Sequence, residues 1–260
     1  MKKLLALGLV VILLLAAFSG CDAVLSFLER FDKIDAAALT NQISTDTIKG
    51  VVKVYNKNYN TFLGMETDSS TAQGSGFCFH IQDGRYYILT NCHVATKDAS
   101  FGKQAFTIED YQGNTYKGYL YKNPNTGISA LAAEYDLACL YFEADSSNVK
   151  KLDILSENPA VGADVISLGA PEGQANTITF GRIDGYGKVT LSETSPSDSN
   201  VTFDVLQHSA YANTGSSGGP LLNADLNVVG VNFAGSVSAE FTAAIPAEKI
   251  QEFLHQYVYN

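Results

Sequence analysis

Short runs of β-branched and aromatic residues, separated by Gly, Asn, Asp and Ser, follow one another along most of the chain after residue 50. Runs of this kind, bounded by turn residues, predict β-strands. Asp83-Gly84 lies between two of them and is typical of a tight hairpin turn. The predicted strands are Val51–Tyr55, Gly76–Ile81, Arg85–Thr90, Ala105–Glu109, Thr115–Tyr121, Leu137–Phe142, Ala163–Leu168, Thr177–Gly181, Gly187–Ser192, Val201–Leu206, Pro220–Leu222, Val228–Val231 and Phe241–Ala244.

Two segments show helical spacing of their apolar residues instead. The first, between residues 22 and 48, predicts a helix or stalk from the positions of Leu25, Leu28, Phe31, Ile34 and Ala38. The second opens with Pro246, a residue favoured at helix starts, and its apolar face consists of Ile250, Phe253, Leu254, Tyr257 and Val258. Many short strands followed by one helix predict an all-β fold in two halves, which the polar stretch Glu143–Asn158 separates.

The N-terminal segment has the pattern of an export signal. Lys2 and Lys3 precede the fifteen-residue apolar run Leu4–Phe18, whereas a membrane-spanning helix needs about 20 residues, so the run predicts a secretory signal peptide. The string Phe18-Ser19-Gly20-Cys21 resembles the lipobox of bacterial lipoproteins, which implies a lipid on Cys21. The alternatives are a plain signal peptide or an uncleaved anchor with an incidental cysteine. We therefore expect an exported protein, lipid-anchored to a bacterial membrane and facing the periplasm or the cell exterior.

Composition and charge exclude several classes of protein. Hydrophobic residues make up 46% of the chain and charged residues 17%, which excludes an intrinsically disordered protein. The formal net charge is -10 at pH 7, from 17 Lys and Arg against 27 Asp and Glu. Because an acidic surface repels phosphate groups, we expect no nucleic-acid partner.

The cysteines predict neither a metal site nor a complete set of disulfides. If Cys21 carries a lipid, three cysteines remain, and an odd number cannot pair completely within one chain. Either one bridge forms, or all three are buried as small apolar residues; they are Cys78, Cys92 and Cys139. Their spacing relative to the four histidines matches no zinc motif, so we expect no metal ion and no cofactor.

The segment Gly215-Ser216-Ser217-Gly218-Gly219-Pro220 contains residues suited to nucleophilic catalysis. Its small residues allow a tight turn that brings a serine hydroxyl close to a substrate backbone. The N–H groups of Gly215 and Ser217 on such a turn can form an oxyanion hole. On composition alone the string is equally typical of a flexible loop, and either serine could be the reactive one.

Two other segments place a histidine and an aspartate at strand ends. Tyr86–Val94 predicts a strand that runs into His93, and Asp136 stands directly before the apolar run Leu137–Leu140. Each residue alone is more often structural, as a strand-end histidine or a turn aspartate. The chain order His, Asp, Ser is nevertheless one of the orders found in hydrolase catalytic triads, so the three segments together predict a hydrolase.

These motifs resemble those of trypsin-like serine peptidases, and among them the bacterial HtrA/Deg-type protease domain. The resemblance spans about residues 48 to 255 and implies two antiparallel β-barrels with the active site in the cleft between them. The matching segments are Gly74–Phe77, Ile88–Val94, Asp136–Ala138, Val161–Gly173, Thr177–Gly181, Gly215–Leu222, Val229–Asn232 and Phe241–Pro246. The chain then divides into a signal peptide (1–20), a stalk or helix (21–47), a first β-barrel (48–145), and a linker, second β-barrel and C-terminal helix (146–260).

The resemblance also implies a role for each candidate residue. Ser217 is the nucleophile, because the family's Gly-Gly-Pro string follows it directly. His93 accepts the serine proton and later donates it to the leaving amine, while Asp136 holds the imidazole in the required tautomer. The N–H groups of Gly215 and Ser217 form the oxyanion hole.

Two departures from the relatives limit what the resemblance implies. Trypsin has an aspartate before the nucleophile, which pairs with a new N-terminal amine after cleavage; the uncharged Ser216 stands at this position. We therefore expect no activation by such cleavage. HtrA-type proteins usually have a PDZ domain after the protease domain, whereas this chain ends soon after its helix, so we transfer no PDZ-based regulation and leave the oligomeric state open.

The substrate pocket is predicted to be apolar. Tyr211 stands six residues before the nucleophile, where trypsin places the aspartate of its pocket, and the pocket wall corresponds to Phe233, Ala234 and Gly235. A cationic side chain would lose its hydration there without gaining a partner, whereas a small aliphatic one gains about 1.5–3 kcal/mol from burial. We therefore expect cleavage after Val, Ala, Ile or Leu, although the nearby His208 leaves a preference for acidic residues open.

We expect the protein to hydrolyse unfolded or extended polypeptides through an acyl-enzyme intermediate. Two alternatives stay open. One is a surface binding protein built on a catalytically inactive peptidase fold, and the other is a relative of the glutamyl endopeptidases, which cleave after acidic residues. The presence of all three triad residue types and of Gly215 favours the active enzyme.

Overall fold

The computed structural model describes residues 36–170, 177–188, 199–212, 214–235 and 242–260. The chain forms two units, Met1–Thr45 and Asp46–Asn260. In the first unit the described part is helix α3 (Ala36–Thr45), which falls within the segment predicted to be a helix or stalk. The predicted signal peptide and the lipidation site at Cys21 lie outside the described residues. No helix in the described ranges is both long and apolar enough to cross a membrane.

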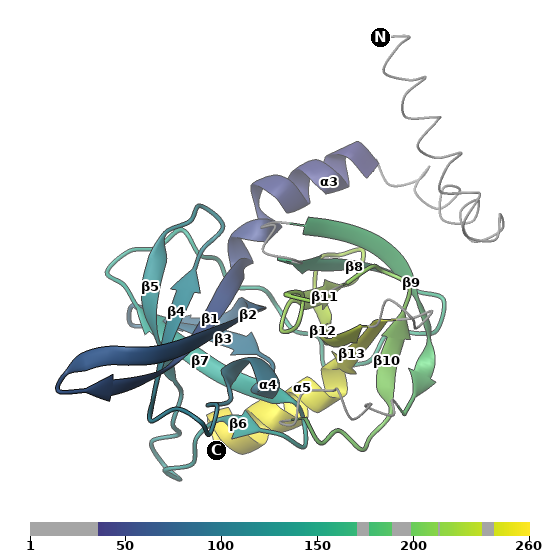
Figure 1. The fold of residues 1–260 in the computed structure, drawn as a ribbon. Coiled ribbons are helices and arrows are strands. Elements are labelled where there is room, and N and C mark those ends of the chain that lie inside the picture. The colour runs from purple at the N-terminus through teal and green to yellow at the C-terminus, as the bar shows by residue number, and fades with distance from the viewer. Residues whose placement is uncertain (1–35, 171–176, 189–198, 213, 236–241) are drawn as a thin grey trace. The chain divides into compact units, whose positions relative to one another are not determined.

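The first half of the larger unit is a closed antiparallel barrel with one extra strand. After the short helix η1 (Thr47–Gly50), the strands follow the spatial order β3-β2-β1-β4-β5-β7-β6, and pairing of β3 with β7 closes the barrel (Figure 1). Side chains alternate between the two faces of each strand, and the inward ones, such as Val54, Ile88 and Leu140, form one core. The strands are β1 (Val51–Phe62), β2 (Met65–Gln82), β3 (Arg85–Thr90), β4 (Lys103–Glu109), β5 (Thr115–Leu120), β6 (Leu131–Ala132) and β7 (Leu137–Glu143).

The second half is a closed barrel of six antiparallel strands in the order β10-β13-β12-β11-β8-β9. Its core contains Val165, Ile183, Leu206, Leu221 and Val229, which come from five different strands. The strands are β8 (Asp164–Gly169), β9 (Thr177–Gly187), β10 (Val205–His208), β11 (Pro220–Leu222), β12 (Val228–Gly235) and β13 (Thr242–Pro246).

The C-terminal segment links the two barrels. Helix α5 (Ala247–Leu254) starts directly after Pro246 and continues as η3 (His255–Tyr259), running from the end of β13 towards the first barrel (Figure 1). The ring centroids of Phe253 and Tyr135 are 6.1 Å apart, and the Tyr121 hydroxyl donates to the Val258 carbonyl oxygen at 3.3 Å. The C-terminal segment therefore begins at the last strand of the second barrel and contacts residues of the first.

The predicted all-β fold of two antiparallel barrels with a final helix is confirmed. After Glu143, the last residue of β7, the polar stretch predicted to separate the halves contains neither a helix nor a regular strand. Its one β-interaction is an isolated bridge between Ile154 and Val228.

The largest difference from the sequence prediction is the length of the first hairpin. The pattern predicts a strand that ends at Tyr55 and a partner that begins at Gly76, but pairing continues until Phe62 faces Met65. Beyond Tyr59, β1 and β2 pair only with each other and project as a ribbon (Figure 1). The β2 half of this ribbon is almost entirely exposed, so no apolar–polar alternation marks the strand there.

The three described cysteines are all free and buried. Burial raises the pKa of the Cys78 thiol to about 12 and also raises the pKa of Cys139. Both groups therefore stay protonated at neutral pH and pack as small apolar side chains. Of the two alternatives for Cys78, Cys92 and Cys139, the structure shows the one without a disulfide.

Candidate active site

The serine motif forms a tight turn before strand β11, and two of its glycines are required by the geometry. Gly218 has a φ of +87°, and a Cβ there would lie 2.1 Å from the Ser75 carbonyl oxygen. A Cβ on Gly219 would lie 2.3 Å from the Leu168 carbonyl oxygen. The turn is therefore packed closely against β2 and β8, and only glycine fits at both positions.

The two adjacent serines of the turn differ in exposure. Ser216 is buried, with 4% of its surface exposed, whereas Ser217 is partly exposed. The Ser216 carbonyl oxygen accepts a hydrogen bond from the Gly219 N–H at 2.9 Å, which closes the turn. Ser217 thus offers the more accessible hydroxyl, as the prediction of the nucleophile requires.

The structure brings the predicted histidine and aspartate into direct contact. His93 lies in the short helix α4 (Cys92–Ala95), which starts just after β3. Its Nδ1 lies 2.9 Å from Asp136 Oδ2 and 3.1 Å from Oδ1, and its backbone N–H donates to Oδ1 at 3.0 Å. Because a carboxylate only accepts hydrogen bonds, Nδ1 carries the proton and the Nε2 of neutral His93 is left as an acceptor. This is the tautomer that a general base requires.

Asp136 is held in an uncommon backbone conformation. Its φ of +48° lies in the left-handed region, and its side chain is fully buried. The Asp136 N–H donates to the Ala133 carbonyl oxygen at 3.1 Å, and the Asn91 side chain donates to the Asp136 carbonyl oxygen at 2.9 Å. These bonds hold the backbone on both sides of the carboxylate, so the carboxylate stays directed at His93.

The histidine and serine segments meet on strand β2. A Cβ on Gly74 would lie 2.7 Å from Val94 Cγ2 and 3.0 Å from the Ser217 carbonyl oxygen. The Ser75 N–H donates to this same oxygen at 2.7 Å. Within the described residues no hydrogen bond joins Ser217 Oγ to the His93 ring; in unliganded enzymes this bond is often long and tightens when substrate binds. All three predicted triad residues therefore gather where the two barrels meet.

The two residues predicted to form the oxyanion hole have backbone N–H groups that are free to bind a substrate oxygen. Gly215 is buried with a φ of +97°, a conformation that only glycine adopts readily. Among the described residues, no protein atom accepts a hydrogen bond from the N–H of Gly215 or Ser217. Two N–H groups without a protein acceptor beside a nucleophile are what a developing oxyanion needs. Their role stays a prediction.

The residues predicted to line the substrate pocket do not form an enclosed pocket in this structure. Tyr211 is 59% exposed, and its backbone carbonyl oxygen accepts a hydrogen bond from Thr179 Oγ1 at 2.7 Å. Phe233 is buried in β12, the strand that also contains Ala234 and Gly235. Tyr211 therefore does not form a closed pocket base in this structure, and its contact with substrate stays a prediction.

His208 is unsuited to binding an acidic substrate. It is completely buried, and its Nε2 lies 3.1 Å from Asn232 Oδ1. The Asn232 side chain in turn donates to Ser167 Oγ at 3.0 Å and to the Gly219 carbonyl oxygen at 3.1 Å. Burial lowers the pKa of His208 to about 4, so the ring is neutral at pH 7. The residue has neither the exposure nor the charge to attract a carboxylate.

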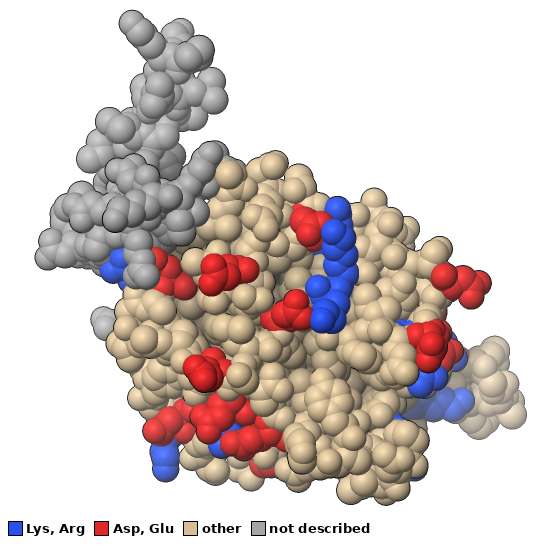
Figure 2. All heavy atoms as spheres, turned by 180° about the vertical axis from the view of Figure 1, so that it is seen from behind, with Lys and Arg blue, Asp and Glu red and all other residues tan. Residues whose placement is uncertain are grey.

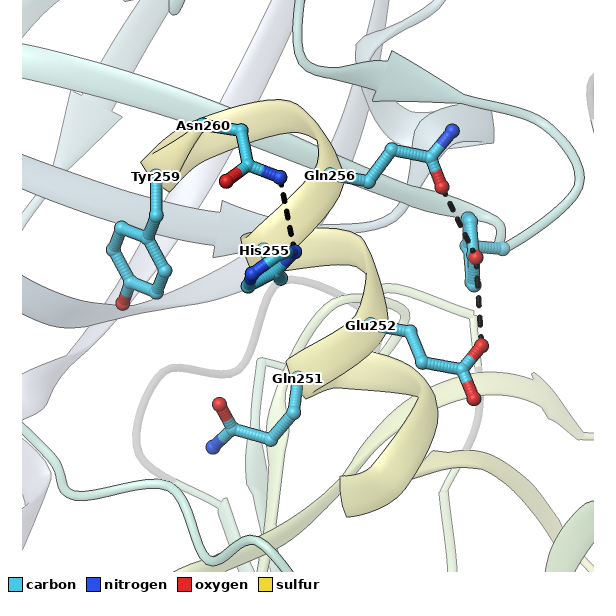
Figure 3. A pocket seen from close by; sticks show the side chains of 7 residues that line it. Gln251, Glu252, His255, Gln256, Tyr259 and Asn260 are labelled. Atoms are coloured by element: carbon cyan, nitrogen blue, oxygen red, sulfur yellow. Dashed lines mark hydrogen bonds between the residues drawn. The ribbon is translucent and has the colours of Figure 1, made fainter.

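A groove of about 630 Å³ along α5 and η3 is lined by none of the three predicted triad residues (Figure 3). The Tyr135 hydroxyl lies 3.4 Å from both Glu252 Oε2 and Gln256 Oε1, and Asn260 Nδ2 lies 3.0 Å from His255 Nδ1. No nucleophile paired with a base lines it, so we place the candidate active site at Ser217. The lining residues are Tyr135, Gln251, Glu252, His255, Gln256, Tyr259 and Asn260.

No cluster of three or more metal-ligating side chains occurs in the part of the chain that the structure describes. On the face shown in Figure 2, acidic and basic side chains are scattered over a mostly uncharged surface.

Comparison with known proteins agrees with this geometry. Residues 74–231 match the family model of the trypsin-like peptidase domain, which is more than half of the chain. The chain belongs to the trypsin-like peptidase family. The matched segment extends from β2 to β12 and includes His93, Asp136 and Ser217.

Within the trypsin-like peptidases, the chain is similar to HtrA-type proteins. It is 32% identical over 226 residues to the serine protease Do-like HtrB of Bacillus subtilis, a match that covers 82% of this chain and 45% of the relative. The serine protease Do-like HtrA of the same organism is 27% identical over 213 residues, covering 78% of this chain and 44% of the relative. The chain thus spans less than half the length of these two relatives. The predicted membership of an HtrA-type, trypsin-like family is confirmed.

A solved structure of similar fold is the Rv3671c protease from M. tuberculosis in its active form. The TM-score is 0.64, and the match covers 85% of this chain and 86% of that protein. At 23% identity this likeness shows the trypsin-like fold alone.

Asn91 and Ser75 both contact the site, although neither was predicted to have a role. Asn91 stands two residues before His93 and Ser75 stands between two glycines, and this was the available signal. Their partners lie 45 and 140 residues away along the chain, at Asp136 and Gly215, so only the folded structure identifies the contacts.

Proposed function

We propose that the protein is a serine endopeptidase that cleaves unfolded or extended polypeptides. The observation that carries the proposal is the pairing of His93 Nδ1 with the buried Asp136 carboxylate, next to the turn that presents Ser217. Membership of the trypsin-like peptidase family and the similarity to Do-like serine proteases support it. Because the chain spans less than half of those relatives, the proposal concerns this chain and not their further domains.

In the first half of the reaction, Ser217 Oγ attacks the carbonyl carbon of the scissile peptide bond. His93 Nε2 accepts the serine proton as the C–O bond forms, and Asp136 stabilises the imidazolium that results. The imidazolium then donates this proton to the leaving amine as the C–N bond breaks, which leaves an acyl-enzyme. A water molecule repeats the sequence in the second half, and Ser217 regains its proton.

In the transition state negative charge develops on the substrate oxygen, and the site must stabilise this charge to lower the activation free energy. We assign this task to the N–H groups of Gly215 and Ser217, which have no other acceptor among the described residues. Removing one such donor typically costs about 2.7–4 kcal/mol of transition-state stabilisation. The two glycines that follow Ser217 let the turn pack closely enough to hold these groups in place.

A fluorophosphonate probe tests the proposed activity directly, because it reacts only with a serine whose base and oxyanion hole are in working order. We expect the purified chain to be labelled at one serine, Ser217, and to hydrolyse an unfolded protein substrate. A folded chain that neither reacts nor hydrolyses would instead support the inactive binding protein.

Substrate selection should favour small and medium aliphatic side chains. Digestion of an unfolded protein, followed by sequencing of the new C-termini, should yield mainly Val, Ala, Ile and Leu, because burial of such a side chain gains about 1.5–3 kcal/mol. Tyr211→Asp should raise cleavage after Lys and Arg if Tyr211 borders the pocket. Dominance of basic or acidic residues at the C-termini produced by the unaltered chain would overturn the assignment.

We propose further that the protein is exported and anchored to a bacterial membrane by a lipid on Cys21. The support is the leader itself, with Lys2 and Lys3 before an apolar run that ends at the lipobox-like string. In a bacterial host, a clickable palmitate analogue should label the chain and the protein should fractionate with membranes. Cys21→Ser should abolish labelling, whereas Ser217→Ala, which leaves the leader intact, should keep it. Equal labelling of the two variants would contradict the proposal.

A further inference from the structure

Ser75 in strand β2 is completely buried and holds the serine turn at two points. Its hydroxyl donates a hydrogen bond to the Gly215 carbonyl oxygen at 2.7 Å, and its backbone N–H donates to the Ser217 carbonyl oxygen, also at 2.7 Å. The hydroxyl also accepts a hydrogen bond from the Ala170 N–H at 3.0 Å. One residue of the first barrel therefore contacts the second barrel on both sides of the predicted nucleophile.

Ser75 is closely packed against the backbone of Gly169 and Gly218. A Cβ on Gly169 would lie 3.3 Å from Ser75 Oγ and 3.3 Å from Ser216 Cα. On the other side, the Cβ position of Gly218 lies 2.1 Å from the Ser75 carbonyl oxygen. Ser75 is thus enclosed between the end of β8 and the serine turn, and no other described side chain donates to the Gly215 carbonyl oxygen.

We infer that Ser75 is a positioning residue of the candidate active site: it orients the oxyanion-hole N–H groups of Gly215 and Ser217. The inference rests on the proposed peptidase function and adds to it. Ser75 does not touch the reacting atoms. It acts through the backbone of the turn.

The physical reason lies in the planarity of peptide groups. Holding the carbonyl oxygens of Gly215 and Ser217 fixes the peptide groups that follow each of these residues. The Ser217 N–H belongs to the peptide group between them, whose Ser216 carbonyl oxygen accepts from the Gly219 N–H at 2.9 Å; Ser75 holds the peptide groups on both sides of it. Gly215, at a φ of +97°, can rotate its flanking peptide groups at little cost unless one of them is held. Donors that are already oriented need no rearrangement when negative charge develops on the substrate oxygen.

Ser75→Ala in the full chain should lower kcat by about 10- to 100-fold, less than the 10²–10³ lost when an oxyanion donor is removed outright. KM should change by less than about threefold, because the hole acts on the transition state more than on bound substrate. Thr90→Val is the matched control. The Thr90 hydroxyl is as completely buried and donates to the Ser75 carbonyl oxygen at 2.7 Å; it packs against Gly218 but makes no hydrogen bond to the turn, and valine keeps its shape.

The decisive measurement compares two inhibitors of the same peptide sequence. A peptidyl trifluoromethyl ketone adds to the Ser217 hydroxyl and leaves a negatively charged oxygen in the hole, whereas an unreactive peptide leaves the hole empty. Ser75→Ala should weaken the ketone at least tenfold relative to the peptide. Thr90→Val should lower the melting temperature while leaving the ratio of the two affinities unchanged.

The outcomes separate this inference from the proposed function. If the unaltered chain neither hydrolyses peptides nor reacts with a fluorophosphonate, the function fails and the inference fails with it. If the unaltered chain is active but Ser75→Ala keeps its kcat, or weakens both inhibitors equally, only the inference is overturned. Should Ser75→Ala not fold, Ser75→Cys takes its place, since a thiol is a weaker donor at the same position. Selective loss of ketone binding then supports the inference, and an unchanged ratio overturns it.

Discussion

Ser217→Ala should lower the rate of peptide hydrolysis by about a millionfold, the loss seen when a triad serine is removed, and should abolish fluorophosphonate labelling. The reason is that no other group can form the acyl-enzyme: the neighbouring hydroxyl of Ser216 is buried, with 4% of that residue exposed. Ser216→Ala should therefore retain most of both signals. The measurements are steady-state hydrolysis of an unfolded substrate and mass spectrometry of the labelled peptide.

Both variants need a check of folding, because Ser216 lies in the closely packed part of the turn. Melting curves that match the unaltered chain would show that any lost activity is chemical. Labelling that persists in a folded Ser217→Ala variant would refute the assignment of the nucleophile. Equal losses in two folded variants would contradict the expected retention in Ser216→Ala.

Asp136→Asn should lower kcat by about 10⁴-fold, the effect expected when the triad carboxylate becomes an amide. The carboxylate accepts both the Nδ1–H and the backbone N–H of His93, at 2.9 Å and 3.0 Å. An amide that turns its NH₂ group to the ring favours the other tautomer, in which Nε2 carries the proton and cannot act as a base. Stopped assays with a sensitive fluorogenic peptide would measure the residual rate.

Asparagine is the appropriate substitution because Asp136 has a φ of +48°. Asn adopts the left-handed region more readily than most residues, so the backbone should keep its shape and the change should be confined to the contact with the ring. Asp136→Ala would add backbone strain and serves as the comparison for folding. A folded Asp136→Asn variant within tenfold of the original rate would show that His93 does not depend on this carboxylate.

The strands of both barrel cores follow from local patterns. Between Arg85 and Thr90, for example, β-branched and aromatic residues fill a half-buried strand, and the predicted bounds match the observed ones. The turn at Asp83-Gly84 also forms as expected, with both residues at positive φ. In these segments the local preference and the tertiary environment favour the same structure.

The long hairpin was not visible in the sequence for a physical reason. Beyond Tyr59 β1 pairs only with β2, and neither strand covers a core there. Without a buried face, the side chains need not alternate, and backbone hydrogen bonding alone extends the ribbon to the turn at Leu63 and Gly64. Leu63, with a φ of +49°, occupies a turn position where Asn or Gly is usual, so turn chemistry gave no signal either.

At the candidate site, too, some features follow from the local sequence and others depend on the folded structure. The sequence by itself determined the residue types of the triad, their order along the chain and the glycines around Ser217, because bond chemistry and tight turns demand particular residues at short spacing. It left open which serine is accessible, whether the cysteines pair, and whether His208 faces substrate. Those answers depend on burial, which arises only when distant strands pack together.

Only the tertiary structure decided how the triad is held. Asn91 reaches Asp136, and Ser75 reaches Gly215 and Ser217, across separations of 45 to 142 residues that no local spacing constrains. The bond of Asn91 forms only when the first barrel closes, and the bonds of Ser75 also require the two barrels to be in contact. Short-range chemistry therefore identifies the reacting groups in this chain, while the long-range packing of the two barrels sets the distances between them.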